Sequence, residues 1–97
     1  MKIVDNRDEL RYEAWLDGEL AGEIRYTLDP GTITLVHTEV EPAHEGEGVG
    51  SALVRGALDD IRARDLRLRP LCPFVADFLK RHPEYDTLVY RVPRHDV

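Results

Sequence analysis

The hydrophobic residues of this chain change their spacing at a cluster of glycines, and this change most constrains the fold. Upstream of Gly48, apolar and polar residues alternate in short runs, with turn signals such as Asp17-Gly18 and Asp29-Pro30-Gly31 between them. This alternation predicts four strands, which span Lys2–Asp5, Leu10–Leu16, Glu19–Leu28 and Thr32–Val40. Because the connecting turns are short, we expect the strands to form an antiparallel meander.

Downstream of Gly48, the spacing is that of an amphipathic helix. Its apolar positions are Leu53, Val54, Ala57, Leu58 and Ile61. A strand over Leu66–Leu71, a helix from Pro73 to His82-Pro83 and a last strand over Thr87–Val92 are expected to follow. The predicted fold class is therefore α+β. An antiparallel sheet is joined to a β-α-β crossover, with two covering helices and a last strand, all in a single domain over residues 1–97.

Composition and charge narrow the classes of partner. The net charge is −6, so the chain lacks the positive field that draws proteins to nucleic acid. No apolar run approaches the roughly 18 residues of a membrane span, and the N-terminal residues turn polar too soon for a signal peptide. One cysteine allows no internal disulfide. We therefore expect a cytoplasmic protein without membrane or nucleic-acid partners. Its four scattered histidines predict no metal site.

The glycines at Gly46, Gly48 and Gly50 lie where a predicted strand meets a predicted helix. The first amides of a helix have no intrahelical acceptor and lie at the positive end of its dipole, so they can bind a phosphate group. The spacing G-x-G-x-G matches neither the dinucleotide fingerprint nor the P-loop. The stretch therefore favours phosphate binding, with a tight turn as the alternative.

The residues around these glycines resemble a known family. Val40-x-Pro42-x-x-Glu45-Gly46-Glu47-Gly48-Val49-Gly50-x-x-Leu53 is similar to motif A of the GNAT superfamily of acetyl-CoA-dependent N-acetyltransferases. Leu71-Cys72-Pro73-Phe74-Val75 and Arg81-His82-Pro83-Glu84-Tyr85 resemble a small single-domain subgroup, the YjdJ-type proteins, which lack the N-terminal helices of larger relatives. The resemblance runs from about Val4 to Val92.

The resemblance implies a binding site for acetyl-CoA. The backbone amides from Gly46 to Ser51 would hold the pyrophosphate, and the amide of Val40 would point at the thioester carbonyl as an oxyanion donor. The residues expected to contact the coenzyme are Val40, Glu45, Gly46, Glu47, Gly48, Val49, Gly50, Ser51, Phe74, Lys80 and Arg81. For Lys80 and Arg81 a solvated helix end is the alternative. The expected partners are acetyl-CoA and an amine acceptor, and the expected state is a monomer or weak homodimer.

Two positions depart from the family pattern. Glu45 replaces the usual Gln or Arg, and a carboxylate pointing into the loop would repel a phosphate. We therefore expect the side chains of Glu45 and Glu47 to point away from the coenzyme. Lys80 occupies the place of a tyrosine that often protonates the leaving thiolate.

Three side chains are candidates for the chemistry. Cys72 ends the fifth predicted strand, and Pro73 starts a helix whose positive end can lower the thiol pKa; simple packing is the alternative. His37 and Glu39 share one face of the fourth strand, where either can act as general base or be a surface polar residue. The sequence thus predicts an N-acetyltransferase acting on a small-molecule amine or a protein lysine. The alternative is an acetyl-CoA-binding sensor or interaction module without efficient turnover.

Overall fold

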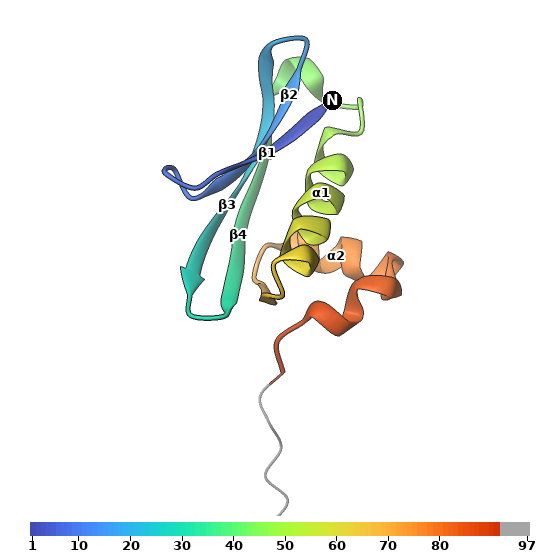
Figure 1. The fold of residues 1–97 in the computed structure, drawn as a ribbon. Helices are drawn as coiled ribbons and strands as arrows, with labels where there is room; N and C mark the ends of the chain where they lie inside the picture. The colour runs from blue at the N-terminus through green and yellow to red at the C-terminus, as the bar shows by residue number, and fades with distance from the viewer. Residues whose placement is uncertain (92–97) are drawn as a thin grey trace, which may run out of the picture.

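The structure, a computed structural model, describes residues 1–91 and contains one five-stranded sheet of order β1-β2-β3-β4-β5 (Figure 1). Strands β1 to β4 pair antiparallel and β5 runs parallel to β4. The strands are β1 (Lys2–Asn6), β2 (Arg11–Leu16), β3 (Glu19–Asp29), β4 (Thr32–Val40) and β5 (Arg67–Pro70). The helices are η1 (Pro42–His44), α1 (Val49–Ala63), α2 (Pro73–Arg81) and η2 (Pro83–Leu88). The predicted meander and β-α-β crossover are confirmed.

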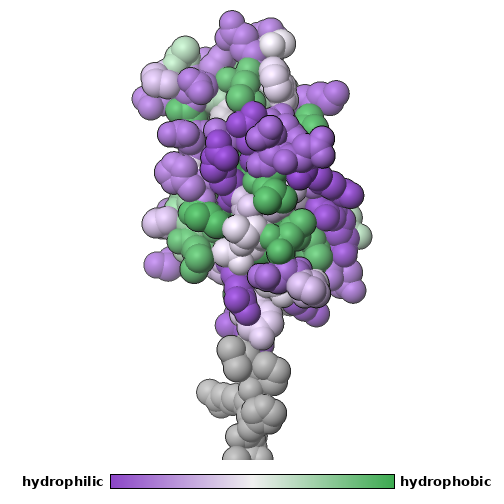
Figure 2. Space-filling model, turned by 90° about the vertical axis from the view of Figure 1, so that its left-hand side faces the viewer, coloured by the Kyte–Doolittle hydropathy of each residue, from purple (hydrophilic) through white to green (hydrophobic). Residues whose placement is uncertain are grey.

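Helices α1 and α2 lie on the same face of the sheet (Figure 1). The predicted apolar stripe of α1 is fully buried there, against inward-facing residues of the strands such as Ile24 and Leu35. Figure 2 looks onto the opposite, uncovered face, where hydrophilic side chains surround smaller apolar patches. Neither helix, within residues 1–91, has the length and apolar character of a membrane span.

The predicted last strand is wrong over the residues that the structure describes. Pro83–Leu88 form the 3-10 helix η2, so Thr87 and Leu88 are helical, and only Val89 makes a single parallel bridge to Leu68. Pro83 supplies a fixed backbone angle and no amide donor, which suits the first turn of a helix. Val92 lies outside the described residues.

A β-bulge interrupts β4 near its middle. Arg25 of β3 pairs with His37, but the next residue, Tyr26, pairs with Leu35, so Val36 has no partner. An extra residue of this kind shifts the alternation of the strand by one position. Side chains and amides beyond Val36 therefore point to the side opposite to the one that uninterrupted alternation would give.

A partly buried polar network connects the C-terminal end of α1 to the sheet. Tyr12 donates a hydrogen bond to Asp60 at 2.7 Å and Tyr26 donates one to Asp5 at 2.6 Å. The Arg64 guanidinium joins the two carboxylates, at 2.9 Å from Asp5 and 3.3 Å from Asp60. Burial, together with the neighbouring carboxylate, raises the pKa of both tyrosines far above the usual value, so their hydroxyls remain donors.

Gly22 of β3 provides a test of this packing. A Cβ at this position would lie 2.9 Å from the backbone oxygen of Glu39 and 3.1 Å from the side chains of Leu53 and Val49. We expect Gly22→Ala to lower the free energy of unfolding by about 1–3 kcal/mol, because backbone cannot move aside as a flexible side chain can. Urea denaturation measures this, with Thr27→Ala on the exposed part of β3 as control. Equal midpoints for the two variants would contradict the packing described.

Candidate functional site

The glycine loop connects β4 to α1 through the short helix η1. Gly46 has a φ of 82° and Gly48, the N-cap of α1, has a φ of 76°. Both values lie in the left-handed region that favours glycine. A Cβ at either residue would meet no atom within 4 Å. The two glycines therefore set the backbone path, and the space beside them is open.

The amides of this loop are available as donors. Glu47 donates to the His44 carbonyl, and the helical ladder of α1 begins with Ala52 donating to the Gly48 carbonyl at 3.1 Å. Within residues 1–91, no protein group accepts a hydrogen bond from the backbone amides of Gly46, Gly48, Val49, Gly50 and Ser51. These donors stand at the positive end of a 15-residue helix, which is the arrangement that binds phosphate groups in proteins.

The two glutamates of the loop have different surroundings. The Glu47 carboxylate lies 3.0 Å from Nδ1 of His44, and the other ring nitrogen of His44 lies 3.3 Å from Glu19 on β3. Glu45 is exposed and makes no side-chain hydrogen bond or ion pair within the described chain. Glu47 is therefore turned toward His44 by a specific contact, whereas Glu45 extends into solvent.

Beside the loop, β4 continues after its pairing with β5 ends, and there it is paired only with β3. The two strands pair only from Thr32 to Leu35 of β4. After Pro70, the last residue of β5, the Leu71 amide turns back to the Arg69 carbonyl at 3.2 Å, and the Cys72 amide donates to the Leu35 carbonyl at 3.0 Å. The segment 36–40 of β4 therefore has one edge that β5 does not cover.

The amide of Val40 points toward this uncovered edge. The next amide, that of Glu41, donates to the carbonyl of Ala21 at 2.8 Å and so points toward β3. Since successive amides of a strand point to opposite sides, the Val40 amide faces away from β3. The role of this amide as an oxyanion donor stays a prediction.

Cys72 lies at the point where β4 and β5 part. Its thiol is 3% exposed, its Sγ lies 3.2 Å from Oγ1 of Thr38, and its amide donates to the Leu35 carbonyl. Burial alone would raise the pKa of the Cys72 thiol. The Thr38 hydroxyl, together with the backbone amides of Val75, Phe74 and Thr38, outweighs burial and lowers the pKa below its usual value. No helix amide makes a hydrogen bond of ordinary geometry to the thiol, so those of α2 act as nearby dipoles.

His37 and Glu39 lie on the uncovered face of the sheet, opposite to Thr38. They are exposed, and their cross-strand partners are Arg25 and Glu23 of β3. No hydrogen bond or ion pair within residues 1–91 links either side chain to Cys72. The structure thus places His37 and Glu39 on the face of β4 opposite to the Thr38–Cys72 contact and does not bring the three candidate catalytic residues into contact.

The expected contacts on α2 lie at opposite ends of that helix. Phe74, in the first turn, packs on the start of α1, because its ring atom Cζ lies 2.8 Å from where a Cβ of Gly50 would be. Lys80 and Arg81 lie in the last turn, about 9–10 Å further along the axis, and Arg81 pairs with Asp77 at 3.4 Å. Of these three residues, Phe74 is the one that packs beside the first amides of α1.

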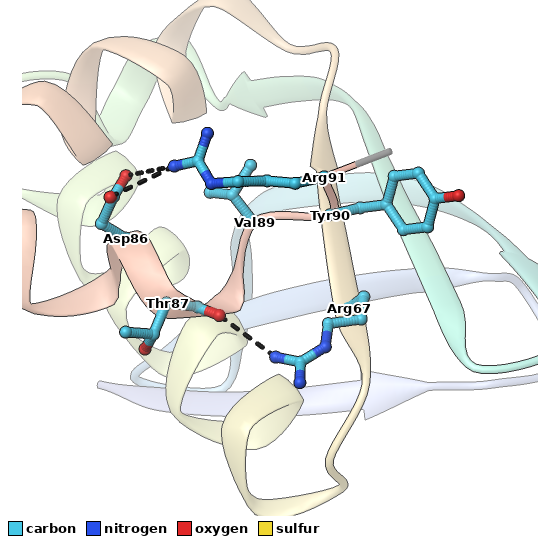
Figure 3. A pocket seen from close by; sticks show the side chains of 6 residues that line it. All are labelled: Arg67, Asp86, Thr87, Val89, Tyr90 and Arg91. Atoms are coloured by element: carbon cyan, nitrogen blue, oxygen red, sulfur yellow. Dashed lines mark hydrogen bonds and ion pairs between the residues drawn. The ribbon is translucent and has the colours of Figure 1, made fainter. Parts of the chain in front are cut away.

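A separate cavity of about 450 Å³ lies at the other edge of β5 (Figure 3). Arg91 pairs with Asp86 there, and Arg67 donates to the Thr87 carbonyl at 3.1 Å. The lining contains neither the glycine loop nor Cys72, so this cavity is not part of the candidate site. Within residues 1–91, no group of His, Cys, Asp and Glu side chains is arranged to hold a metal ion.

Sequence reasoning missed Thr38 as the partner of Cys72. Residue alternation placed Thr38 on the opposite face from His37 and Glu39, which is confirmed. The contact with Cys72 depends on the β-bulge at Val36, which aims Thr38 at the parting of the strands. No residue in the stretch signals such a bulge.

Thr38→Val tests the environment of the thiol. Removing the hydroxyl that lies beside Sγ should raise the pKa of Cys72, because one of the groups that favour the thiolate is lost. Ultraviolet absorbance of the thiolate, followed as a function of pH, reports the change at one thiol since the chain has one cysteine. Thr27→Val, on the exposed part of β3, is the control. An unchanged or lower pKa in Thr38→Val would show that the hydroxyl does not act on the thiol.

Comparison with known proteins agrees with this geometry. Residues 11–88 match the model of the GCN5-related N-acetyl-transferase family. Protein NATD1 of Bos taurus is 37% identical over 51 residues, which are 53% of this chain and 45% of that protein. Protein NATD1 of Homo sapiens is 33% identical over 51 residues, 53% of this chain and 45% of that protein. These matches therefore span less than half of the curated relatives.

Two solved structures share the fold. A GCN5-like protein from Staphylococcus aureus, solved by NMR in solution, has a TM-score of 0.69 and 23% identity and covers 97% of this chain and 92% of its own. The ribosomal-protein-alanine N-acetyltransferase of Brucella melitensis has a TM-score of 0.55 and 21% identity, over 90% of this chain and 66% of its own. Together with the family match over residues 11–88, which is most of the chain, this shows that the protein belongs to the GCN5-related N-acetyltransferase (GNAT) family.

Proposed function

We propose that the protein transfers the acetyl group of acetyl-CoA to a primary amine, either of a small molecule or of a protein lysine. The observation that carries this proposal is the row of available amides in the glycine loop, at the N-terminus of α1 and beside the uncovered edge of β4. A pyrophosphate needs convergent donors, and an amide-containing arm can pair with a free strand edge. The loop amides and the uncovered strand edge both lie where β4 leads into α1.

In the proposed complex, the amides from Gly46 to Ser51 bind the pyrophosphate of the coenzyme. The pantetheine arm lies along segment 36–40 of β4, where β5 no longer covers the strand. The Val40 amide, which faces away from β3, donates to the thioester carbonyl oxygen as that oxygen gains negative charge. Phe74, already packed on Gly50, borders the path between α1 and α2.

The transfer requires a base and a proton donor. The amine nitrogen forms a bond to the acetyl carbon, the carbon–sulfur bond breaks, the amine loses a proton, and the departing thiolate gains one. His37 and Glu39 are exposed on the uncovered face, from which an amine can reach β4, and either is suited to accept the proton. The usual proton donor, a tyrosine, is replaced by Lys80. The polar side chains that lie where β4 separates from β5 are instead those of Cys72 and Thr38.

Binding without efficient turnover is the second candidate. Two substitutions favour this candidate. Glu45 replaces a Gln or Arg that would donate to phosphate, and Lys80, in the last turn of α2, replaces the tyrosine that often protonates the leaving thiolate. Such a protein would act as an acetyl-CoA sensor or interaction module. Coenzyme binding together with acetyl transfer to an amine panel supports the enzyme; binding without transfer supports the sensor.

Gly48→Ala tests the phosphate site. We expect this substitution to weaken coenzyme A binding about tenfold or more, because a Cβ would both strain the left-handed backbone and enter the space beside the amides. The matched control is Gly31→Ala, since Gly31 has a φ of 74° and equally open surroundings but lies in the β3–β4 turn. Isothermal calorimetry measures both. Equal affinities of the two variants for coenzyme A would show that the loop is not part of the coenzyme site.

Cys72→Ala tests whether the thiol carries the acetyl group. If Cys72 accepts acetyl, the sulfur–carbon bond to the coenzyme is exchanged for one to Cys72, and free coenzyme A is released. Incubation with acetyl-CoA should then add one acetyl group to the intact mass of the wild type and none to Cys72→Ala. If the wild type gains no mass while Cys72→Ala retains activity, Cys72 only packs at the site.

A further inference from the structure

The glycine loop contains an acidic residue that is held by a histidine. Glu47 stands between Gly46 and Gly48, among the available amides, and its Oε2 lies 3.0 Å from Nδ1 of His44. The Nε2 atom of the same ring lies 3.3 Å from Glu19 on β3. His44 thus connects the loop to the neighbouring part of the sheet.

This geometry favours a charged ring. A neutral imidazole has one N–H and one lone pair, so it can donate to only one of two carboxylates and would present its lone pair to the other. The imidazolium donates to both. The two carboxylates come from separate elements, Glu47 from the loop and Glu19 from β3. Glu41 and Glu45, the nearest acidic residues in sequence, make no hydrogen bond or ion pair with the ring in the described chain.

Resting on the coenzyme site proposed above, we infer that His44 is a positioning residue for coenzyme binding. Its imidazolium draws the Glu47 carboxylate away from the phosphate-binding amides and compensates its charge. When the ring loses its proton, Glu47 is released beside the site as an uncompensated anion and repels the pyrophosphate. Coenzyme affinity should therefore depend on the protonation of His44.

The direction of the pH effect follows from the surroundings of the ring. The hydrogen bond to Glu47 raises the pKa of His44, and the one to Glu19 adds to this. The imidazolium is therefore present below the raised pKa and lost as the pH rises through it. Affinity for the coenzyme should fall over the same interval.

Calorimetric titration with coenzyme A at about pH 6 and about pH 8.5, on either side of a histidine transition, tests the inference. The wild type should bind more tightly at the lower pH. His44→Phe, which keeps a ring but has no donors, should bind about tenfold more weakly at the lower pH and lose the pH dependence. His44→Lys, with a lasting positive charge, should retain the affinity at both values.

Two further variants separate the charge effect from a change in shape. Glu47→Gln should bind at both pH values at least as tightly as the wild type does at the lower one, and should restore binding to His44→Phe. His82→Phe, in which the replaced ring stacks on Phe78 at the far end of α2, should behave as wild type. Circular dichroism confirms that each variant is folded.

The outcomes distinguish this inference from the proposed function. If the wild type shows no saturable binding of coenzyme A, the proposed function fails and this inference fails with it. Suppose instead that the wild type binds coenzyme A. If His44→Phe then binds equally well at the lower pH, or if the affinities of both proteins fall by the same factor as the pH rises, the coenzyme site stands and the role of His44 is refuted.

Discussion

The parting of β4 from β5 is the constraint on which the rest of the site depends. After Pro70 the Leu71 amide turns back to the Arg69 carbonyl and the Cys72 amide donates to the Leu35 carbonyl, so β5 ends where β4 continues. The β-bulge at Val36 then turns the amide of Val40 toward the uncovered edge. Without either feature, β4 would be paired or its amides would point the other way. The thiol of Cys72 and the glycine loop both lie beside the edge that results.

The negative net charge of the chain disfavours a phosphate ligand. In the proposed site, the groups that bind the phosphate are backbone amides rather than side chains. Amide donors carry no formal charge and do not titrate, so they remain donors at any pH at which the chain is folded. Of the two glutamates in the loop, Glu47 is paired with His44 and Glu45 extends into solvent. The network around Arg64 fastens the opposite end of α1 to the sheet, so the helix that presents these amides is held in place.

Most of the fold could be predicted because its elements are strongly periodic. The alternation over Thr32–Val40 and the helical spacing from Leu53 to Ile61 correspond to β4 and the buried stripe of α1. Over the described residues the predicted last strand is wrong, because Pro83 starts a 3-10 helix that includes Thr87 and Leu88. The bulge at Val36 and the contact between Thr38 and Cys72 could not be predicted, since both depend on pairing between distant residues. The glycine loop could be predicted from the sequence, because a helix start and left-handed glycines are local properties.

The central claim is that the glycine loop and the free edge of β4 form one coenzyme site. The most direct measurement is an amide chemical-shift titration of the isotopically labelled protein with coenzyme A. The account predicts saturable shifts that are largest for the amides from Gly46 to Ser51 and for Val40, with little change around Arg67 and Tyr90 at the separate cavity. Shifts confined to that cavity, or no saturable shift at all, would contradict it.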